Sequence, residues 1–266
     1  FNFQVDWGDG ITETGITNDN ISTKSKHQYQ NAGTYDIKIK GKYESLRGSY
    51  DAMKTANYDK LKKVKQWGTT GLKHVKFEFC YNLNEIVSPT ENSFINLLGI
   101  DFGYTDIQSI PENLFANCPN VTVFASSFEG CRNLTSIPKN LFRNCPNITS
   151  FYYTFSECSN LTSIPENLFT NCPNVDNFKN TFSKCSSLTG IPAKLFDNCE
   201  KVEDFEFTFN GCTSLTGNAP ELWKRGTNSE ENDYRGYPRG CNCFYGCNNL
   251  KNYKEIPDYW KDAGPQ

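Results

Sequence analysis

Residues 155–181 read FSECSNLTSIPENLFTNCPNVDNFKNT, and units of the same pattern lie on both sides of this stretch. Leu-Phe pairs recur every 27 residues along the chain, and two sets of cysteines recur with the same period. Within each unit the motif Phe-x-x-Cys-x-x-Leu/Val/Ile-x-x-Ile/Phe occurs twice, 13 or 14 residues apart. Self-similarity at a fixed period of this length predicts a solenoid, in which each repeat buries one slice of core against its neighbours.

One coil of this solenoid takes the whole 27-residue unit, because 13 residues are too few for a closed turn with two faces. The Leu-Thr-Ser-Ile segment 134–137 and its copies are expected to be short strands, which pair about 4.8 Å apart into a parallel sheet. Segment 121–124 and its copies form a second inward-facing segment. The repeated core positions are Phe128, Cys131, Leu134, Ile137, Phe155, Cys158, Leu161, Ile164, Phe182, Cys185, Leu188 and Ile191.

A short helix is expected between these two segments of each coil. Pro138, Pro165 and Pro192 each open a Pro-x-x-Leu-Phe frame. Proline is pre-organised for the first helical position, so a helix of one to two turns should start there. Asn-Cys-Pro-Asn then ends the helix, because proline cannot continue it and asparagine favours turns. The predicted fold is an α/β repeat solenoid of short parallel strands and short helices.

The two ends of the repeat region are expected to be caps. From about residue 217 the pattern changes, since Trp223 replaces Phe and a polar insertion follows at about 224–240. Terminal repeats must cover the last slice of core, so a C-terminal cap is predicted there. Residues 43–73 are interpreted as a basic linker and N-terminal cap, and residues 74–266 as the solenoid with its C-terminal cap.

Residues 1–42 are predicted to form a separate β-module. Phe3-x-Val5-x-Trp7 alternates, Gly8-Asp9-Gly10 turns the chain, and Tyr35-x-Ile37-x-Ile39 alternates again. The Trp-Gly-Asp-Gly turn, followed by His-x-Tyr and a Gly-x-Tyr strand, resembles the polycystic-kidney-disease-type (PKD-like) immunoglobulin-like β-sandwich. The resemblance covers about forty residues, so the module is expected to be an incomplete or reduced version of that sandwich.

The order of these parts resembles the BspA-like leucine-rich-repeat surface proteins of gut and oral bacteria. The residues that carry the resemblance are the Trp-Gly-Asp-Gly module, a linker with Gln-Trp-Gly, and then the Phe-x-x-Cys-x-x-Leu repeats. Members of that family are typically exported, and several are implicated in adhesion to host matrix proteins or to other cells. The resemblance implies a leucine-rich-repeat fold and an extracellular or cell-surface location. The present coil is longer than is usual in the family, so no particular ligand is carried over.

Composition and charge argue against several classes of protein. The formal net charge is −3, which gives no overall basic field for nucleic acid. The charge is uneven, because residues 38–76 hold eleven Lys or Arg against three acids, and the sequence after them is acidic. No apolar run reaches about 18 residues, so no membrane-spanning segment is expected in this chain. There are two histidines and no recognisable catalytic motif, so neither an enzyme nor a cofactor is predicted.

The twelve cysteines have two interpretations. An exported protein would normally use them in disulfides, but their fixed places beside apolar residues favour free, buried thiols. Cys241, Cys243 and Cys247 fall within seven residues, and of these Cys247 also belongs to the repeat frame. A local disulfide involving Cys241 or Cys243 stays open, and zinc is disfavoured because a fourth ligand and the usual paired spacing are missing. Asp6, Asp9 and Asp19 could hold calcium, although a plain turn is favoured. No metal site is therefore predicted.

A binding surface is predicted on the outward residues of the second inward-facing segment. These residues change from coil to coil within a constant frame, as recognition requires, and exposed tyrosines are good anchors for a partner. The candidate residues are Tyr152, Tyr153, Asp176, Lys179, Glu203, Asp204 and Glu206.

The favoured function is an adhesin-like, non-enzymatic module that binds a protein or glycan of a host or neighbouring cell. One alternative is a structural subunit or spacer of a bacterial surface layer, appendage or phage particle. Another chain could then supply a strand to the N-terminal β-module, which would make self-association a property of that module. A second alternative is an accessory module of an enzyme.

Overall fold

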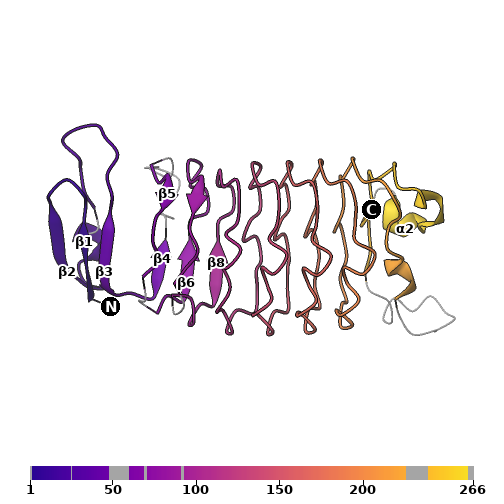
Figure 1. Ribbon diagram of the computed structural model, residues 1–266, viewed down its shortest axis with the longest axis horizontal. Helices are drawn as coiled ribbons and strands as arrows, with labels where there is room; N and C mark the ends of the chain where they lie inside the picture. The colour runs from indigo at the N-terminus through magenta and orange to yellow at the C-terminus, as the bar shows by residue number, and fades with distance from the viewer. Residues whose placement is uncertain are drawn as a thin grey trace.

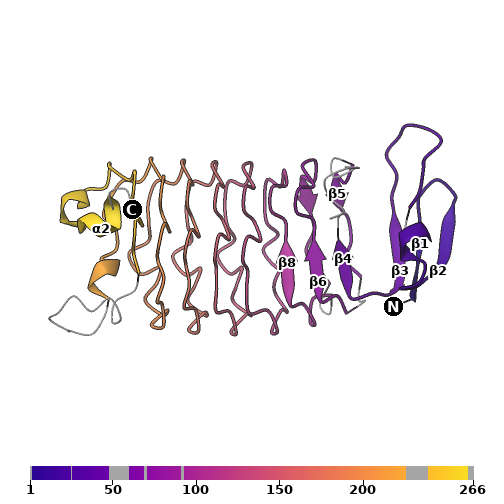
Figure 2. The same cartoon turned by 180° about the vertical axis from the view of Figure 1, so that it is seen from behind.

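The repeats form a single row of stacked coils. Figures 1 and 2 show this row from two sides, with a small sheet at its N-terminal end and a helical cap at its C-terminal end. The computed structural model describes residues 2–24, 26–47, 60–68, 71–90, 93–225 and 239–262.

The N-terminal module is one antiparallel sheet of three strands. Strand β1 (Asn2–Asp6) lies in the centre and pairs with β2 (Thr12–Ile16) and with β3 (Lys38–Lys42). A single turn of helix, α1 (Ile21–Lys24), follows β2. The described residues of 1–42 contain no second sheet, so the resemblance to an incomplete or reduced sandwich stays a prediction. Among the side chains that the structure describes in this module, Val5 and Ile16 are the buried apolar ones, and two such residues are too few to hold two sheets together.

Aromatic rings replace a larger core in this module. The expected strand at 35–39 is wrong in its first half, because β3 begins only at Lys38 and Ile37 is 49% exposed. The ring of Tyr35 instead stacks on that of Tyr29 with centroids 4.1 Å apart. The Tyr29 hydroxyl donates a 2.9 Å hydrogen bond to the Trp7 carbonyl, which ties this loop to the Trp-Gly-Asp-Gly turn.

The first coils of the solenoid carry two short parallel sheets. One sheet has the order β4 (Ser45–Arg47), β6 (His74–Lys76) and β8 (Gly99–Asp101). The other pairs β5 (Lys63–Val64) with β7 (Glu85–Ile86). Strands β4 and β5 come from segment 43–73, of which residues 48–59, 69 and 70 lie outside the described residues. The described part of this segment therefore forms the beginning of the stack.

Trp67 anchors that first slice to the repeats. Its side chain is 2% exposed and its Nε1 donates a 2.7 Å hydrogen bond to the Val87 carbonyl. Its ring contacts Phe94 edge-on at 5.0 Å between centroids and lies 6.3 Å from Phe77. A buried tryptophan with its N–H satisfied covers the end of the phenylalanine core.

From residue 102 onward, each coil contains two consecutive turns, and backbone hydrogen bonds from these turns join one coil to the next. In the coil that starts at Phe151, the amide of Thr154 bonds the Phe151 carbonyl and that of Cys158 bonds the Phe155 carbonyl. The third residues of these turns, Tyr153 and Glu157, have positive φ angles of 56° and 60°. Alternate amides also donate to the following coil, for example Phe151 to Asn177 at 2.9 Å.

We call the surface of these paired turns, with the segments that lead into them, the turn face. The left-handed residues interrupt extended backbone, so parallel pairing continues only as isolated bridges from Val123 to Ser150, Asn177, Asp204 and Arg239. The turn face comprises residues 74–81, 99–106, 122–132, 149–159, 176–186, 203–213 and 239–247.

Two expectations about the rest of each coil are wrong. Segment 134–137 and its copies at 161–164 and 188–191 are not sheet strands, because a single backbone bond joins successive threonines, such as Thr162 N–H to Thr135 C=O at 3.3 Å. The degenerate copy at 83–86 does contain a strand, β7. The Pro-x-x-Leu-Phe frame forms separate turns, with bonds such as Leu141 N–H to Pro138 C=O at 3.2 Å. The described residues between 93 and 221 contain no helix. The eight residues from Pro138 to Cys145 leave little room for the four-residue bonds that an α-helix must repeat.

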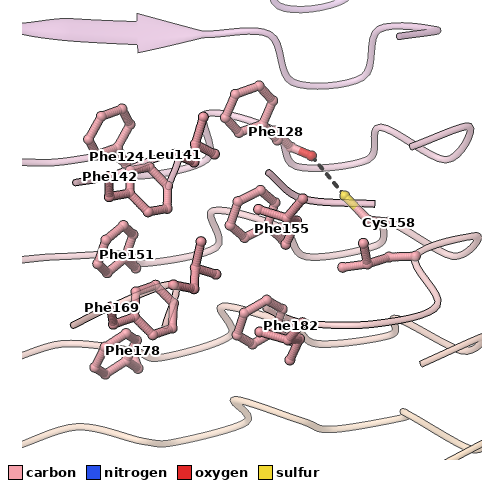
Figure 3. Close-up of a cluster of buried hydrophobic side chains, with 14 of the residues drawn as sticks. Phe124, Phe128, Leu141, Phe142, Phe151, Phe155, Cys158, Phe169, Phe178 and Phe182 are labelled. Atoms are coloured by element: carbon pink, nitrogen blue, oxygen red, sulfur yellow. Dashed lines mark hydrogen bonds between the residues drawn. The ribbon is translucent and has the colours of Figure 1, made fainter. Parts of the chain in front are cut away.

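Phenylalanine columns form the core of the stack. Phe128, Phe155 and Phe182 lie one above another with centroids 5.5 and 5.7 Å apart and nearly parallel planes. Figure 3 shows this column beside a second group of rings from the same coils, among them Phe142 and Phe169. All five rings are fully buried, and burial of each such side chain stabilises the fold by about 1.5–3 kcal/mol. All the repeated core positions predicted from the sequence are buried.

Non-repeated residues close the C-terminal end. The cap contains two 3₁₀ turns, η1 (Leu222–Lys224) and η2 (Tyr253–Glu255), and helix α2 (Asp258–Lys261). The Arg225 guanidinium donates to the Phe196 carbonyl at 2.6 Å, and the Asn252 side chain bonds both the amide and the carbonyl of Ala219. Of the predicted insertion at 224–240, residues 226–238 lie outside the described residues.

Candidate functional site: the turn face of the solenoid

The repeated cysteines are part of the core and not of a site. All twelve lie in described residues, and each is free and buried. The thiol of Cys158 donates to the Phe128 carbonyl of the preceding coil at 3.1 Å, as Figure 3 shows, and Cys185 repeats this contact with Phe155 at 3.2 Å. Burial raises the pKa of the Cys131 thiol to about 12. Such thiols are poor nucleophiles and poor metal ligands.

The three cysteines near the C-terminal end follow the same rule. Cys241, Cys243 and Cys247 are all free and buried, and burial raises the pKa of the Cys243 thiol well above its usual range. The Cys247 thiol donates to the Phe209 carbonyl at 3.1 Å, so it occupies the repeated position. The local disulfide that the sequence left open is not formed in this structure.

The acidic residues of the Trp-Gly-Asp-Gly turn stabilise the turn itself. The Asp6 carboxylate accepts the Gly8 amide at 2.9 Å, and the Asp9 carboxylate accepts both the Ile11 amide at 3.1 Å and the His27 ring at 2.7 Å. Within the part of the chain that the structure describes, no group of three or more His, Cys, Asp or Glu side chains could hold a metal ion.

The predicted tyrosine pair lies on the turn face. Tyr152 is 38% exposed, and its ring meets that of Tyr153 edge-on with centroids 4.4 Å apart. Tyr152 follows the buried Phe151, and Tyr153 is the left-handed residue of the first turn. Burial, followed by the proximity of Tyr152, raises the pKa of the Tyr153 hydroxyl. The constant frame therefore presents two neighbouring rings, of which Tyr152 is exposed and Tyr153 is half-buried.

Charged candidates of the next two coils lie beside this pair. Lys179 occupies the position of Tyr152 one coil further on, and its Nζ lies 2.5 Å from the Glu206 carboxylate and 6.0 Å from the Phe207 ring centroid. The hydrogen bond to Glu206 raises the pKa of Lys179. Asp176 and Glu203 are exposed, and their backbones are joined by a 2.8 Å bond from the Glu203 amide. The structure thus brings these four candidates together on two successive coils.

Asp204 was expected to face outward, and this expectation is wrong. The residue is 3% exposed, its carboxylate accepts the Glu206 amide at 2.8 Å, and it pairs with Arg239 at 3.2 Å. The preceding coils place Asn177 and Ser150 in the same role, each accepting the amide two residues further on. A short polar acceptor at this repeat position was visible in the sequence and would have indicated a structural role.

Other exposed aromatic residues of this face were not predicted. Tyr81 is 57% exposed in the first coils, and Tyr245 is 51% exposed in the last one. Both lie in the degenerate copies of the repeat, where the motif Phe-x-x-Cys is followed or interrupted by tyrosine. Comparison of corresponding positions across all coils, including these copies, would have found them.

The comparisons with known proteins agree with the repeat fold. The family described as "BspA type Leucine rich repeat region" matches in six copies, over residues 52–176 and 92–219. This match confirms the predicted repeat fold and the resemblance of the repeats, while the PKD-like interpretation of residues 1–42 stays a prediction. No curated protein matches the chain.

One similar solved structure is described as "Structure of the Toll - Spatzle complex, a molecular hub in Drosophila development and innate immunity". The identity is 15% and the TM-score 0.24, with 60% of this chain and 33% of that chain covered. This chain therefore spans about a third of that chain's length. Separately, no helix among the described residues is both long and apolar enough to cross a bilayer.

Proposed function

Since the chain belongs to the BspA-type leucine-rich-repeat family, we propose that it is a non-enzymatic, secreted or cell-surface binding module of the adhesin type. Its turn face contacts a protein or glycan of a host or neighbouring cell. The observation that carries this proposal is the ring pair of the exposed Tyr152 and the half-buried Tyr153, on a frame that is otherwise repeated from coil to coil.

The physical basis is the rigidity of this frame. Tyrosine gives a large contact area at a small cost in conformational entropy, and it often dominates the energy of protein interfaces. Because Phe151 and Phe155 are fully buried on either side of the pair, the two tyrosines are held before a partner arrives. Binding then costs little ordering of the backbone.

The location is tested by protease treatment of intact source cells, followed by mass spectrometry of the released peptides. Peptides from the repeats should appear while the cells stay intact. If they appear only after lysis or only in shed particles, the surface location is wrong.

The binding site is tested with an array of matrix proteins and glycans. The Tyr152→Ala/Tyr153→Ala protein should lose at least ten-fold in affinity for the ligand that the unaltered protein binds. Ser136→Ala, at an exposed position away from the turn face, is the matched control and should keep full affinity. Equal affinity of both variants would exclude the tyrosine pair as the binding site.

A structural subunit or spacer is the second candidate function. The observation that favours it is the strand order β2-β1-β3, in which each outer strand pairs on one side only and could accept a strand from another chain. Sedimentation velocity over a range of protein concentrations tests this idea. Concentration-dependent assembly that is lost on deletion of residues 1–42 would favour the spacer over the adhesin.

A further inference from the structure

A second surface lies at the N-terminal end of the turn face, and none of its residues was predicted as a binding residue from the sequence. Its member Glu129 lies on the coil before the Tyr152–Tyr153 pair and is close enough for its charge to raise the pKa of Tyr153. Its backbone continues the stack, because the Phe79 amide bonds the Gly103 carbonyl at 2.9 Å and the Tyr104 amide bonds the Glu129 carbonyl at 2.6 Å. We call this surface the acidic–aromatic patch. It consists of Glu78, Phe79, Tyr81, Tyr104 and Glu129, together with the buried Asp101, whose carboxylate accepts the Gly103 amide at 2.9 Å.

The aromatic part of the patch is a set of adjoining rings. Phe79 stacks on Tyr104 with centroids 5.2 Å apart, and Tyr81 lies 6.1 Å from Phe79. Tyr81 is the most exposed of the large apolar or aromatic side chains that the structure describes, at 57%. Tyr104 can lie across the next coil because the residue below it is Gly130, where a Cβ would overlap its ring.

The acidic part is three carboxyl groups beside these rings. Glu129 accepts the Tyr104 hydroxyl at 2.9 Å. Burial, and then the negative charges of its acidic neighbours, raises the pKa of Glu78, and burial raises the pKa of Asp101. Lys76 is the base whose positive charge opposes this effect at both groups. The patch therefore carries more negative charge than the neighbouring Lys76 neutralises.

The rest of the turn face differs in this respect. Glu157 pairs with Arg132 at 3.1 Å and with Lys184 at 2.7 Å. Lys179 pairs with Glu206 at 2.5 Å. Because these charges are balanced within the protein, they offer little to an incoming cation. Asp176 and Glu203 are also exposed acids of the turn face, but the patch is where carboxyl groups adjoin a set of exposed and half-buried aromatic rings.

We infer that the acidic–aromatic patch binds an extended, lysine- or arginine-rich segment of a protein partner. The face of an aromatic ring attracts a cation, and neighbouring carboxylates add to this attraction. The patch spans three coils, or about 10 Å along the stack at the usual spacing of paired strands, which suits consecutive basic side chains of an extended chain. This site goes beyond the proposed function, which rests on Tyr152 and Tyr153.

The test is a fluorescence polarisation titration with a fluorescein-labelled hexa-arginine peptide, using hexa-citrulline as the neutral probe of the same shape. The unaltered protein should bind the first probe and not the second. Glu78→Gln/Glu129→Gln should raise the Kd at least ten-fold, and Tyr81→Ala should raise it about three- to ten-fold. The glutamines keep the shape of the side chains, and Tyr81 is exposed, so the melting temperature should stay within about 2 °C of the original.

Two control variants distinguish binding at the patch from diffuse attraction to an acidic protein and from binding at the tyrosine pair. Glu112→Gln/Glu166→Gln removes the same charge from exposed positions outside the turn face and should change the Kd less than two-fold. An equal effect of the two double variants would mean diffuse attraction to an acidic protein and would overturn the inference. Loss of hexa-arginine binding in Tyr152→Ala/Tyr153→Ala alone would also overturn it. Retained hexa-arginine binding in a protein whose tyrosine pair binds no surface ligand would instead contradict only the proposed function.

Discussion

Single residues in the left-handed conformation allow the coils to turn twice on one face. The second turn of successive coils places Gly130, Glu157, Lys184 and Gly211 at the same position, all with positive φ. A residue with a Cβ costs about 1–2 kcal/mol more than glycine in this conformation. Glu157 and Lys184 tolerate that cost and gain an ion pair with each other at 2.7 Å. The residue type at this position is therefore set partly by contacts between coils.

The two glycines at this position predict different costs for the same substitution. Gly211→Ala adds a Cβ whose nearest neighbour would be Lys184 Cγ at 3.5 Å, so it should cost about 1 kcal/mol through its φ angle alone. Gly130→Ala adds the same strain and also overlaps the Tyr104 ring, which adds about 1–3 kcal/mol of overpacking. Urea unfolding of the two variants measures the difference. An equal decrease in the free energy of unfolding of the two variants would show that the Tyr104 ring does not lie across Gly130.

The repeated buried cysteines are expected to have thiols that do not react in the folded protein. Burial raises the pKa of the Cys80 thiol to about 11, and Cys158 is fully buried with its thiol bonded to Phe128. A chromogenic disulfide reagent at pH 8 should therefore label almost no thiol in the native state and all twelve in denaturant. Cys241, at 5% the most exposed of the twelve, should react first. Rapid labelling of several thiols in the native state would contradict the packing described here.

At the scale of the element, the sequence period predicts which residues are buried better than which secondary structure they form. Phenylalanine, leucine and cysteine at fixed spacing identify the core because burial depends on the apolar pattern. The expected strands at 134–137 and helices after Pro138 failed, because the propensity of a few residues is weak beside the geometry of a closed coil. Positive φ at Tyr153 could not be predicted, since tyrosine rarely adopts it.

The sequence predicted some residues of the candidate site and missed others. Variation among outward positions located Tyr152 and the Lys179–Glu206 pair, because these positions have no role in the repeated core. The burial of Asp204 was missed because a carboxylate that accepts the Glu206 amide and pairs with Arg239 looks like an exposed one when its own coil is considered alone. The signal is the short polar residue at the same position of the preceding coils, Asn177 and Ser150. The acidic–aromatic patch was missed because all its residues except Glu129 lie in degenerate repeats, where no constant frame marks the outward positions.

Ion pairs between coils predict a loss of stability in acid. The hydrogen bond from Lys184 lowers the pKa of Glu157, so this carboxylate contributes stability above its unfolded pKa, and that contribution is lost as the pH falls through the folded pKa. Glu157→Gln should cost about 0.3–1 kcal/mol at pH 7. The difference should shrink as the pH falls through the folded pKa of Glu157, because the protonated carboxyl and the glutamine amide are both neutral. Thermal unfolding at a series of decreasing pH values measures this difference, and a difference that does not fall with pH would assign the effect to packing.

The whole molecule behaves as a linear array if each coil depends only on its neighbours. Removal of residues 155–181 joins Thr154 to Phe182 and leaves every position of the frame occupied by its equivalent, so that Phe128 would stack on Phe182. The shortened protein should fold, with a urea m-value reduced in proportion to the buried surface that is lost. Removal of residues 155–168 deletes half a coil. It would bring the Leu-Phe turn of one coil against the turn face of the next, and this variant should not fold cooperatively. Circular dichroism during urea unfolding distinguishes the two deletions, and a cooperative transition in both would show that the stack does not require the 27-residue register.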